Sequence, residues 1–571
     1  MHSFKGFLFL FLIWLSFWCY FFVIFGVEFT LAQTSIPRSA APERLEKRFK
    51  RPERPKSMFK KIFPKSREEL SPKQLNKIRF VLRGLFVKGS TVYSNKRFSR
   101  LDRKFRGKEI SLKKVYEWRD RITAKYRNDG YILSQAVIVP QEISNGIVVI
   151  QIIEGYISDV MVSGEINGPK SFLSSYIKGV KEVRPLNAQD LERYLLFIDD
   201  LPGVSVQSVL SPSKKNDKSG ATTLKLVLEN KQYDTNIGFD NKGTKFNGPF
   251  QVSFGASENA NLNLFEQIGI NGVVTTQTDE LLFISGLLRL PLTSEGTLLS
   301  ISGSVSASEP GATLKDFQIV GDSKTFTYQL SHPFRRSRGE NLRGTLTFTS
   351  KNSKTDILGA LASEDRIRIL SLGTSYDFID RLKGLNQIGL TLHQGINIFD
   401  ATEPGSPNLT RVNGKSNFTK LTGNSLRIQQ LFPGFSLLGA MNWQYSFDNL
   451  LSSEEFGIGG AQFVRGYDSS EATGAQGLAF KLEFQYGLKI KFPYLKDIQG
   501  FAFYDRGKVW AKGADSGAEN PVSLDSFGFG MRYNVTNSIS GAIEVDFPMA
   551  GNVSSEGNKD PRMFFSLGAR M

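Results

Sequence analysis

The sequence predicts an α+β pair of small domains followed by an antiparallel transmembrane β-barrel of about sixteen strands. Three observations predict it: an N-terminal leader with a long uncharged apolar run, two successive β-α-α-β-β patterns, and alternating apolar and polar residues from 232 to 571. A chain of 571 residues is also too long for one compact core, so several domains are expected.

Residues 1–32 have the layout of a secretory signal peptide. Lys5 supplies a positive start, residues 7–27 carry no charge, and cleavage is expected after Ala32. The apolar run is about twenty residues long, so a retained membrane anchor is the alternative. Cys19 is the only cysteine, so a cleaved chain would contain neither disulfides nor cysteine ligands.

Positive charge is concentrated near the N-terminus. The net charge is +17, and between Arg38 and Arg127 about thirty basic residues face about ten acidic ones. Such a segment could bind nucleic acid, could be attracted to anionic lipid headgroups or to an acidic client protein, or could be a solvated surface. Export makes the second interpretation more plausible than the first. Residues 33–74 form a basic, proline-rich linker with a short helix expected at 42–50.

The first small domain is expected at residues 75–155. Val115, Trp118 and Ile122 recur at helical spacing after Ser111, a candidate N-cap. The expected elements, in order, are an extended run at 78–82, helices at 97–105 and 112–126, and strands at Tyr131–Val139 and 146–153.

The same order of elements repeats at residues 156–231. The expected elements are an extended run at 157–162, helices at 172–177 and 187–197, and strands at Val204–Leu210 and 222–228. Each domain would leave a sheet edge unpaired, and such an edge can bind an extended peptide through main-chain hydrogen bonds. The candidate docking edges for a client are Tyr131–Val139 and Val204–Leu210.

Strict alternation marks the last region, residues 232–571. In Leu478–Tyr486 every even position is large and apolar, and every odd one is small or polar. A soluble β-sandwich alternates as well. Strand lengths near nine residues, about sixteen such segments and export without disulfides favour a membrane barrel, because a spanning sheet must close to satisfy its backbone in lipid.

The titratable residues give no sign of an enzyme. His2 lies in the leader, while His332 and His393 are far apart and have no partners at ligand spacing. No hydrolase nucleophile elbow, zinc-protease motif or phosphate-binding loop occurs. We therefore expect no catalytic residue, no cofactor and no metal.

Two segments stand out from the strand pattern. Residues 456–467 (FGIGGAQFVRGY) form a glycine-containing loop between strands, and residues 503–510 (FYDRGKVW) lie on a strand. Strict alternation with Phe501, Phe503 and Val509 facing lipid would turn Asp505 outward too. A bulge near Gly507, or a position above the hydrocarbon, is then required.

These two segments resemble the two signature motifs of two-partner secretion transporters. That family belongs to the barrel superfamily that also contains the barrel-assembly insertases. Segments 239–243 (FDNKG) and 330–338 (LSHPFRRSR) add support. The resemblance spans nearly the whole mature chain. It implies a plug-like N-terminal segment, two periplasmic POTRA domains at 75–155 and 156–231, and a sixteen-stranded barrel at 232–571.

The resemblance also implies a site in the lumen. The first motif would tip a loop folded back into the barrel, and Arg465 would pair with Asp505, either bracing the loop or controlling its movement. A guanidinium inside a barrel needs a carboxylate, so the pairing is physically reasonable. The implied loop residues are Val464, Arg465, Gly466 and Tyr467, with Gly459, Gly460, Phe503 and Gly507 in support.

The implied function is export of an unfolded exoprotein, large and β-helical, across an outer membrane. Outer-membrane lipids and the barrel-assembly machinery are the other expected partners, and nucleic acid is not. The alternative is a factor that inserts barrel proteins into the outer membrane. A basic nucleic-acid-binding protein would require a cytoplasmic chain. One departure is Met571, because outer-membrane barrels commonly end in an aromatic residue.

Overall fold

The computed structural model describes residues 37–49, 72–164, 167–213, 220–488, 495–513 and 521–571. The expected signal peptide lies outside these residues, as does much of the expected linker. Among the described residues, no helix has the length and apolar character needed to cross a bilayer.

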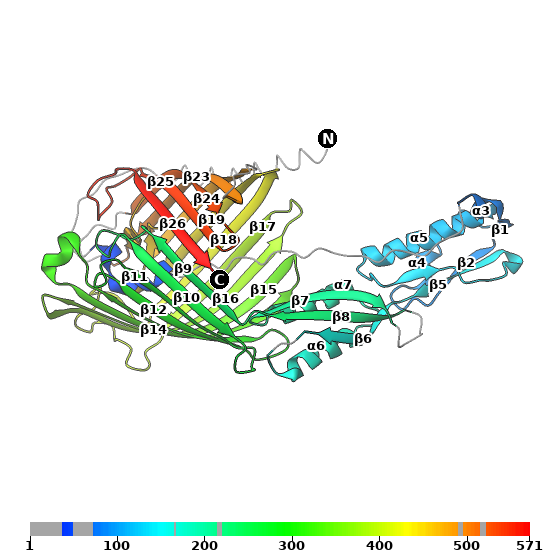
Figure 1. Cartoon of the computed structure of the whole chain (residues 1–571), viewed down its shortest axis with the longest axis horizontal. Coiled ribbons are helices and arrows are strands. Elements are labelled where there is room, and N and C mark those ends of the chain that lie inside the picture. The colour runs from blue at the N-terminus through cyan, green and yellow to red at the C-terminus, as the bar shows by residue number, and fades with distance from the viewer. Residues whose placement is uncertain (1–36, 50–71, 165–166, 214–219, 489–494, 514–520) are drawn as a thin grey trace. The chain divides into compact units, whose positions relative to one another are not determined.

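Sixteen antiparallel strands form a closed barrel, as the alternation predicted (Figure 1). Neighbouring strands follow the chain order, and the last strand closes the barrel against the first. The strands are β9 (Tyr233–Asp240), β10 (Gln251–Asn259), β11 (Gln267–Thr275), β12 (Leu282–Pro291), β13 (Leu298–Ser308), β14 (Val320–Arg336), β15 (Glu340–Ile357), β16 (Ala360–Ile379), β17 (Leu385–Gly395), β18 (Thr419–Phe432), β19 (Phe435–Ser446), β22 (Gln476–Leu488), β23 (Asp497–Trp510), β24 (Val522–Asn534), β25 (Ile539–Pro548) and β26 (Arg562–Arg570).

Alternation along each strand separates the two faces of the wall. On β14, Phe326, Tyr328 and Leu330 are exposed on the outer face, whereas the Thr325 hydroxyl donates to Glu46 inside the barrel. A wall that is apolar outside and polar inside suits lipid around the barrel and water within it.

The strands differ greatly in length. Strands β14, β15 and β16 have 17, 18 and 20 residues, whereas β9 has 8. The tight turn between β15 and β16 consists of Leu358 and Gly359, both at positive φ, 51° and 76°. Two left-handed residues in succession match the twist of a two-residue hairpin.

The last strand closes the barrel despite its non-aromatic end. Strand β26 pairs with β9 from Ser566 to Arg570. The backbone N–H of Met571 donates to the carbonyl of Thr235 at 2.9 Å, and the N–H of Thr235 donates back at 3.1 Å. Alternation rather than the terminal side chain therefore suffices to predict this strand.

The first small domain contains a three-stranded sheet in the order β2-β5-β4. Trp118, Ile122 and Tyr126 of helix α5 are buried against the sheet, and Ser111 is at the N-cap position but its side chain makes no capping hydrogen bond. The elements are α3 (Pro72–Lys77), β1 (Arg79–Val81), β2 (Gly84–Lys88), α4 (Asn95–Phe98), β3 (Glu109–Ser111), α5 (Leu112–Asn128), β4 (Gln135–Val137), η3 (Ser144–Gly146) and β5 (Ile147–Ile153).

Three expectations for this domain need correction. The strand expected at Tyr131–Val139 is only Gln135–Val137, because Tyr131 packs on the Tyr126 ring and turn hydrogen bonds hold residues 130–134. The helix expected at 97–105 ends at Phe98. Strand β2 was not anticipated, because its five residues, which are followed by Gly89 at a φ of 83°, give too short an alternation to recognise.

The second small domain follows the expected order of elements. Its sheet runs β6-β8-β7, with helices α6 and α7. The Asn187 side chain caps α7 by accepting from the N–H of Gln189 at 2.9 Å. The elements are β6 (Tyr156–Ser163), α6 (Lys170–Glu182), α7 (Ala188–Asp199), β7 (Val204–Pro212) and β8 (Ala221–Asn230).

Candidate functional site

The segment that joins β19 to β22 folds back against the inner wall of the barrel. It contains the short helix η5 (Ser452–Glu454) and the ribbon of β20 (Phe456–Ile458) and β21 (Ala472–Gly474). Gly459 and Gly460 turn the chain with φ of 107° and 89°. A Cβ on Gly459 would lie 2.1 Å from the Asp468 carbonyl oxygen, so only glycine fits there.

Apolar packing anchors the tip of this loop. Val464 and Tyr467 are fully buried with Ile458 in a cluster that includes Val509 of β23. The Tyr467 hydroxyl accepts from the N–H of Ala550 at 2.8 Å. Val464 adopts a positive φ of 62°, which is costly for a β-branched residue and places the next side chain against the wall.

Arg465 and Asp505, paired by the resemblance, lie together in the structure. The guanidinium Nε and Nη2 donate to the two carboxylate oxygens of Asp505 at 2.9 and 3.0 Å. The backbone N–H of Arg465 donates to Asp505 as well, at 3.2 Å. Asp505 is fully buried. This two-pronged geometry is strong and directional, because a planar fork meets two oxygens.

The orientation expected for strand β23 was wrong. Its pairing with β22 and β24 is continuous, so there is no bulge beside Gly507. Phe501 and Phe503 face the lumen together with Asp505, and the Arg465 guanidinium stacks 3.4 Å above the Phe503 ring. An aromatic face attracts a cation, so these rings line the polar interior instead of facing lipid.

Gly507 allows the loop to approach the wall. A Cβ at this position would lie 2.7 Å from the Ile458 side chain and 3.2 Å from that of Val464. A Cβ on Gly466 would come within 3.0 Å of the Pro548 backbone nitrogen. The two glycines thus permit close contact between the loop and the wall.

Two charged residues of the site escaped the sequence analysis. Glu483 of β22 accepts from Arg465 Nη1 at 2.7 Å and from Arg532 Nη1 at 2.7 Å, so it joins the two arginines. Two guanidiniums thereby face two carboxylates, which balances their charge in the interior. The odd position of Glu483 in the alternating segment already placed it in the lumen, and that was the available signal.

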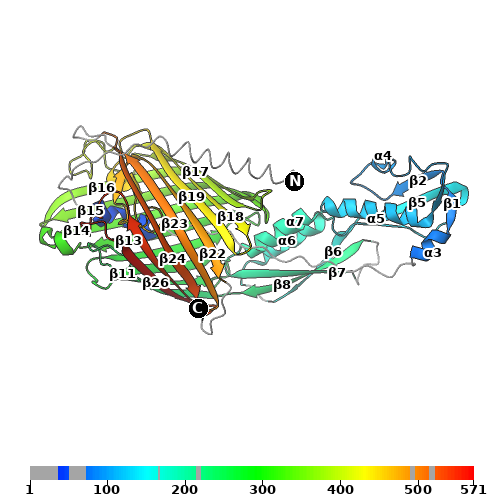
Figure 2. The same cartoon turned by 90° about the horizontal axis from the view of Figure 1, so that it is seen from above.

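Residues 38–49 also lie inside the barrel, against this loop (Figure 2). They form η1 (Arg38–Ala40), η2 (Pro42–Arg44) and α2 (Leu45–Phe49). Arg44 donates to the carbonyls of Ser452 at 2.5 Å and Glu455 at 3.2 Å. Arg38 forms an ion pair with the Glu455 carboxylate at 3.6 Å.

Two acidic loop residues, Glu454 and Glu455, lie opposite the basic side chains of the N-terminal segment. Burial alone would raise the pKa of Glu454. The ammonium groups of Lys420, Lys47 and Lys351 lower this pKa by more than burial raises it, so it lies well below the usual range. Lys420 donates to it at 2.6 Å. An ionised carboxylate is therefore held where the basic N-terminal segment meets the loop.

The chain matches known protein families in its barrel and in its first small domain. Residues 220–533, more than half of the chain, match the haemolysin secretion/activation protein ShlB/FhaC/HecB family. The chain belongs to this family. Residues 80–155 match the POTRA domain of ShlB type, which identifies the first small domain.

Two curated relatives of the family match over most of their length. The heme/hemopexin transporter protein HuxB of Haemophilus influenzae is 24% identical over 482 residues, covering 80% of this chain and 81% of the relative. The outer membrane transporter CdiB of Escherichia coli O6:K15:H31 (strain 536 / UPEC) is 24% identical over 463 residues, covering 78% and 77%.

Solved structures support the fold. CdiB from Escherichia coli aligns with a TM-score of 0.69 at 20% identity, covering 88% of this chain and 93% of that one. BamA from Haemophilus ducreyi lacking POTRA domains 1–3 aligns with a TM-score of 0.50 at 12% identity, covering 86% and 100%. The second likeness shows a shared barrel architecture and no more.

Family membership confirms the main interpretation of the sequence. The protein is an outer-membrane transporter of the two-partner secretion type, with its POTRA region in the periplasm. The matching family is one of secretion proteins, which favours export over the insertion of barrel proteins. Its named relatives are transporters and not enzymes.

Proposed function

We propose that this ShlB-type transporter captures one unfolded exoprotein in the periplasm and threads it through the lumen once residues 38–49 and the loop at 447–475 have moved. The main support is the kind of contact that holds the N-terminal segment. Arg44, Lys47 and Arg38 bind it to the loop through polar and ionic contacts. Water or a passing polypeptide can offer these groups replacement hydrogen bonds once the segment moves.

Strand β7 is the stronger of the two candidate docking edges. It offers nine residues and, among the described residues, pairs only with β8. Strand β4 offers three, and beyond it the Gln141 side chain closes on the Val149 backbone with hydrogen bonds of 2.7 and 2.8 Å. We assign Val204–Leu210 as the main docking edge for the client and Tyr131–Val139 as a minor one.

The free energy for export would come from folding of the client outside the cell. The sequence contains no phosphate-binding loop that would use a nucleotide. A chain that folds outside the cell cannot slide back, so folding makes each step of the passage irreversible. This scheme requires an exoprotein that is stable only after it has left the lumen.

Deleting the gene tests the proposal. We expect one large protein to disappear from the culture medium and to be degraded in the periplasm, with the barrel proteins of the outer membrane unchanged. An unchanged set of secreted proteins would contradict export. Broad loss of barrel proteins would point to an insertase.

Docking of the client at β7 predicts that two matched substitutions differ in their effect on export. Val209 of β7 and Met161 of β6 are 56% and 55% exposed, and both are register partners of Lys225 on the central strand. Val209→Lys should lower export of the missing protein about tenfold, because it places a charge where an apolar client side chain would pack. Met161→Lys, on the opposite edge, should leave export unchanged. Equal effects of the two variants on export would rule out β7 as the docking edge.

A further inference from the structure

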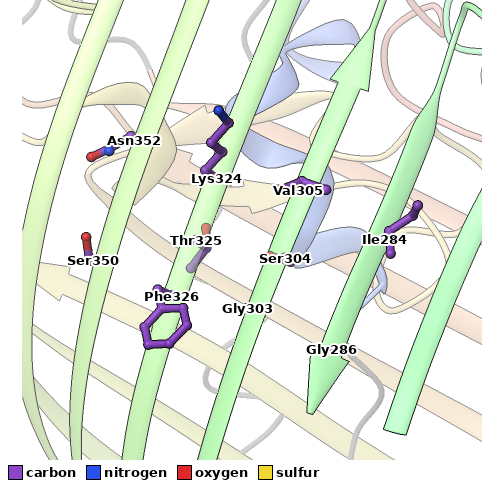
Figure 3. Close-up of a pocket in the computed structure, with 10 residues that line it drawn as sticks. All are labelled: Ile284, Gly286, Gly303, Ser304, Val305, Lys324, Thr325, Phe326, Ser350 and Asn352. Atoms are coloured by element: carbon purple, nitrogen blue, oxygen red, sulfur yellow. The ribbon is translucent and has the colours of Figure 1, made fainter.

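The outer wall of the barrel is hollowed between β12 and β15. The hollow has a volume of about 340 Å³, within the usual range for ligand sites. Gly286 of β12 and Gly303 of β13 are register partners at its floor, and Ile284, Val305 and Phe326 flank them (Figure 3). A Cβ on Gly286 would meet nothing within 4 Å, so the space above it is open.

Register shows that this hollow faces outward. Phe283, next to Ile284 on β12, packs against Phe49 of the N-terminal segment at 4.9 Å between ring centroids, so odd positions of β12 face the lumen. The neighbouring even positions, including Gly286, then face the surroundings of the barrel. Val305 and Phe326 are 47% and 42% exposed on that side.

The polarity of the wall changes at the upper edge of the hollow. Three register rows cross β14, β15 and β16 in succession, and they are Leu330–Leu346–Leu372, Tyr328–Phe348–Leu370 and Phe326–Ser350–Arg368. The next rows are Lys324–Asn352–Arg366 and the mixed-charge Asp322–Lys354–Glu364. The apolar belt therefore ends near Phe326, where lipid headgroups begin.

The chain path identifies the leaflet. The second POTRA-type domain ends at Asn230 and the barrel begins at Tyr233, so that end of β9 lies on the periplasmic side. Strands alternate in direction, so β14 begins at Val320 on the outer side. Lys324 consequently lies at the headgroup level of the outer leaflet.

The polar rim of the hollow consists mainly of donors. Among the described residues, no carboxylate lies within ion-pair distance of Lys324, whose side chain is exposed. The Asn352 side-chain oxygen accepts from Arg368 Nη1 at 2.8 Å, which leaves the amide hydrogens of Asn352 to face the rim. An ammonium and an amide donor beside an apolar hollow recognise an anion that carries an acyl chain.

We propose that this hollow binds a phosphorylated glycolipid of the lipid A class in the outer leaflet. One phosphate would contact Lys324 and Asn352, and one acyl chain would lie over Gly286 and Gly303 between Val305 and Phe326. Strands lie about 4.8 Å apart, so Arg366, two strands from Lys324, is about 10 Å away and could contact a second phosphate. This inference does not depend on which client is exported.

Native mass spectrometry of the folded, full-length protein in detergent tests the site with diphosphorylated lipid A as the probe. Lys324→Gln should weaken lipid A binding about fivefold, because it removes one cation at the headgroup level. Gly286→Val should weaken it at least as much, because the added Cβ would meet nothing within 4 Å and the isopropyl group would occupy the hollow. Lys315→Gln, at an exposed lysine of the outer turn η4 (Ala312–Phe317), is the matched control and should bind as the wild type does.

A second arm separates the headgroup from the acyl chain. Lipid A stripped of its phosphates should bind more weakly to the wild type, and equally to the wild type and Lys324→Gln. Equal binding of both lipids to the wild type overturns the proposal. So does wild-type affinity in either Lys324→Gln or Gly286→Val, once heat-dependent gel mobility shows that each barrel is folded.

Discussion

We expect the Arg465→Ala variant to lose about 3–5 kcal/mol of barrel stability and most of its export activity. The substitution leaves Asp505, which is fully buried, without its guanidinium, and Glu483 keeps Arg532 and Gln485 as donors. Unfolding in denaturant measures the loss of stability, and the amount of client in the medium measures export. Arg335→Ala is the matched control. Its pair with Glu340 is exposed at 2.6 Å, so it should cost at most about 1 kcal/mol.

A double variant separates bracing from control of movement. Adding Asp505→Asn to Arg465→Ala removes the unpaired buried charge and should restore part of the stability. If export returns along with stability, Arg465 only braces the loop. If stability returns without export, the pair also controls the movement of the loop. Equal stability of the Arg465→Ala and Arg335→Ala variants would contradict any structural role for the Arg465–Asp505 pair.

The second large effect concerns the N-terminal segment. Arg44→Gln should raise the open probability of the pore in planar lipid bilayers at least tenfold. The buried guanidinium donates to two loop carbonyls, and hydrogen bonds from charged donors contribute about 1.5–3 kcal/mol each. Deleting residues 38–49 sets the upper limit of conductance.

Lys354→Gln is the control for this measurement. It breaks an ion pair with Asp356 at 2.6 Å on the outer face of β15, outside the lumen. Its conductance should match that of the wild type. If Arg44→Gln also conducts as the wild type does, the segment does not close the pore, and the loop at 447–475 must do so alone.

Alternation predicted the architecture well because lipid imposes it. In Leu478–Tyr486 the even residues face outward and Glu483 faces the lumen, so the pattern read correctly. It failed at Phe501 and Phe503, whose rings lie beneath Arg532 and Arg465. An aromatic ring is apolar by composition but accepts a cation on its face, and sequence does not tell which face of the wall it uses.

Contacts that are distant in sequence account for the rest. A short helix near residues 42–50 was expected, and α2 is found there. Its position in the lumen depends on Arg44 meeting Ser452 and Glu455, and no local pattern encodes such a meeting. The alternation of its strand predicted that Glu483 faces the lumen. Its role depends on donors from two other segments, because Arg465 and Arg532 both donate to it, and the alternation did not predict them.

The long strands on one side of the barrel have a practical consequence at the cell surface. At about 3.3 Å per residue, the 20 residues of β16 extend for about 66 Å, against about 26 Å for the 8 residues of β9. Since the apolar belt ends near Phe326, the hairpin at Leu358 and Gly359 lies beyond the outer leaflet, and Leu358 is 64% exposed. An epitope inserted there would be reachable by antibodies on intact cells, and would report whether the barrel has been delivered in the correct orientation.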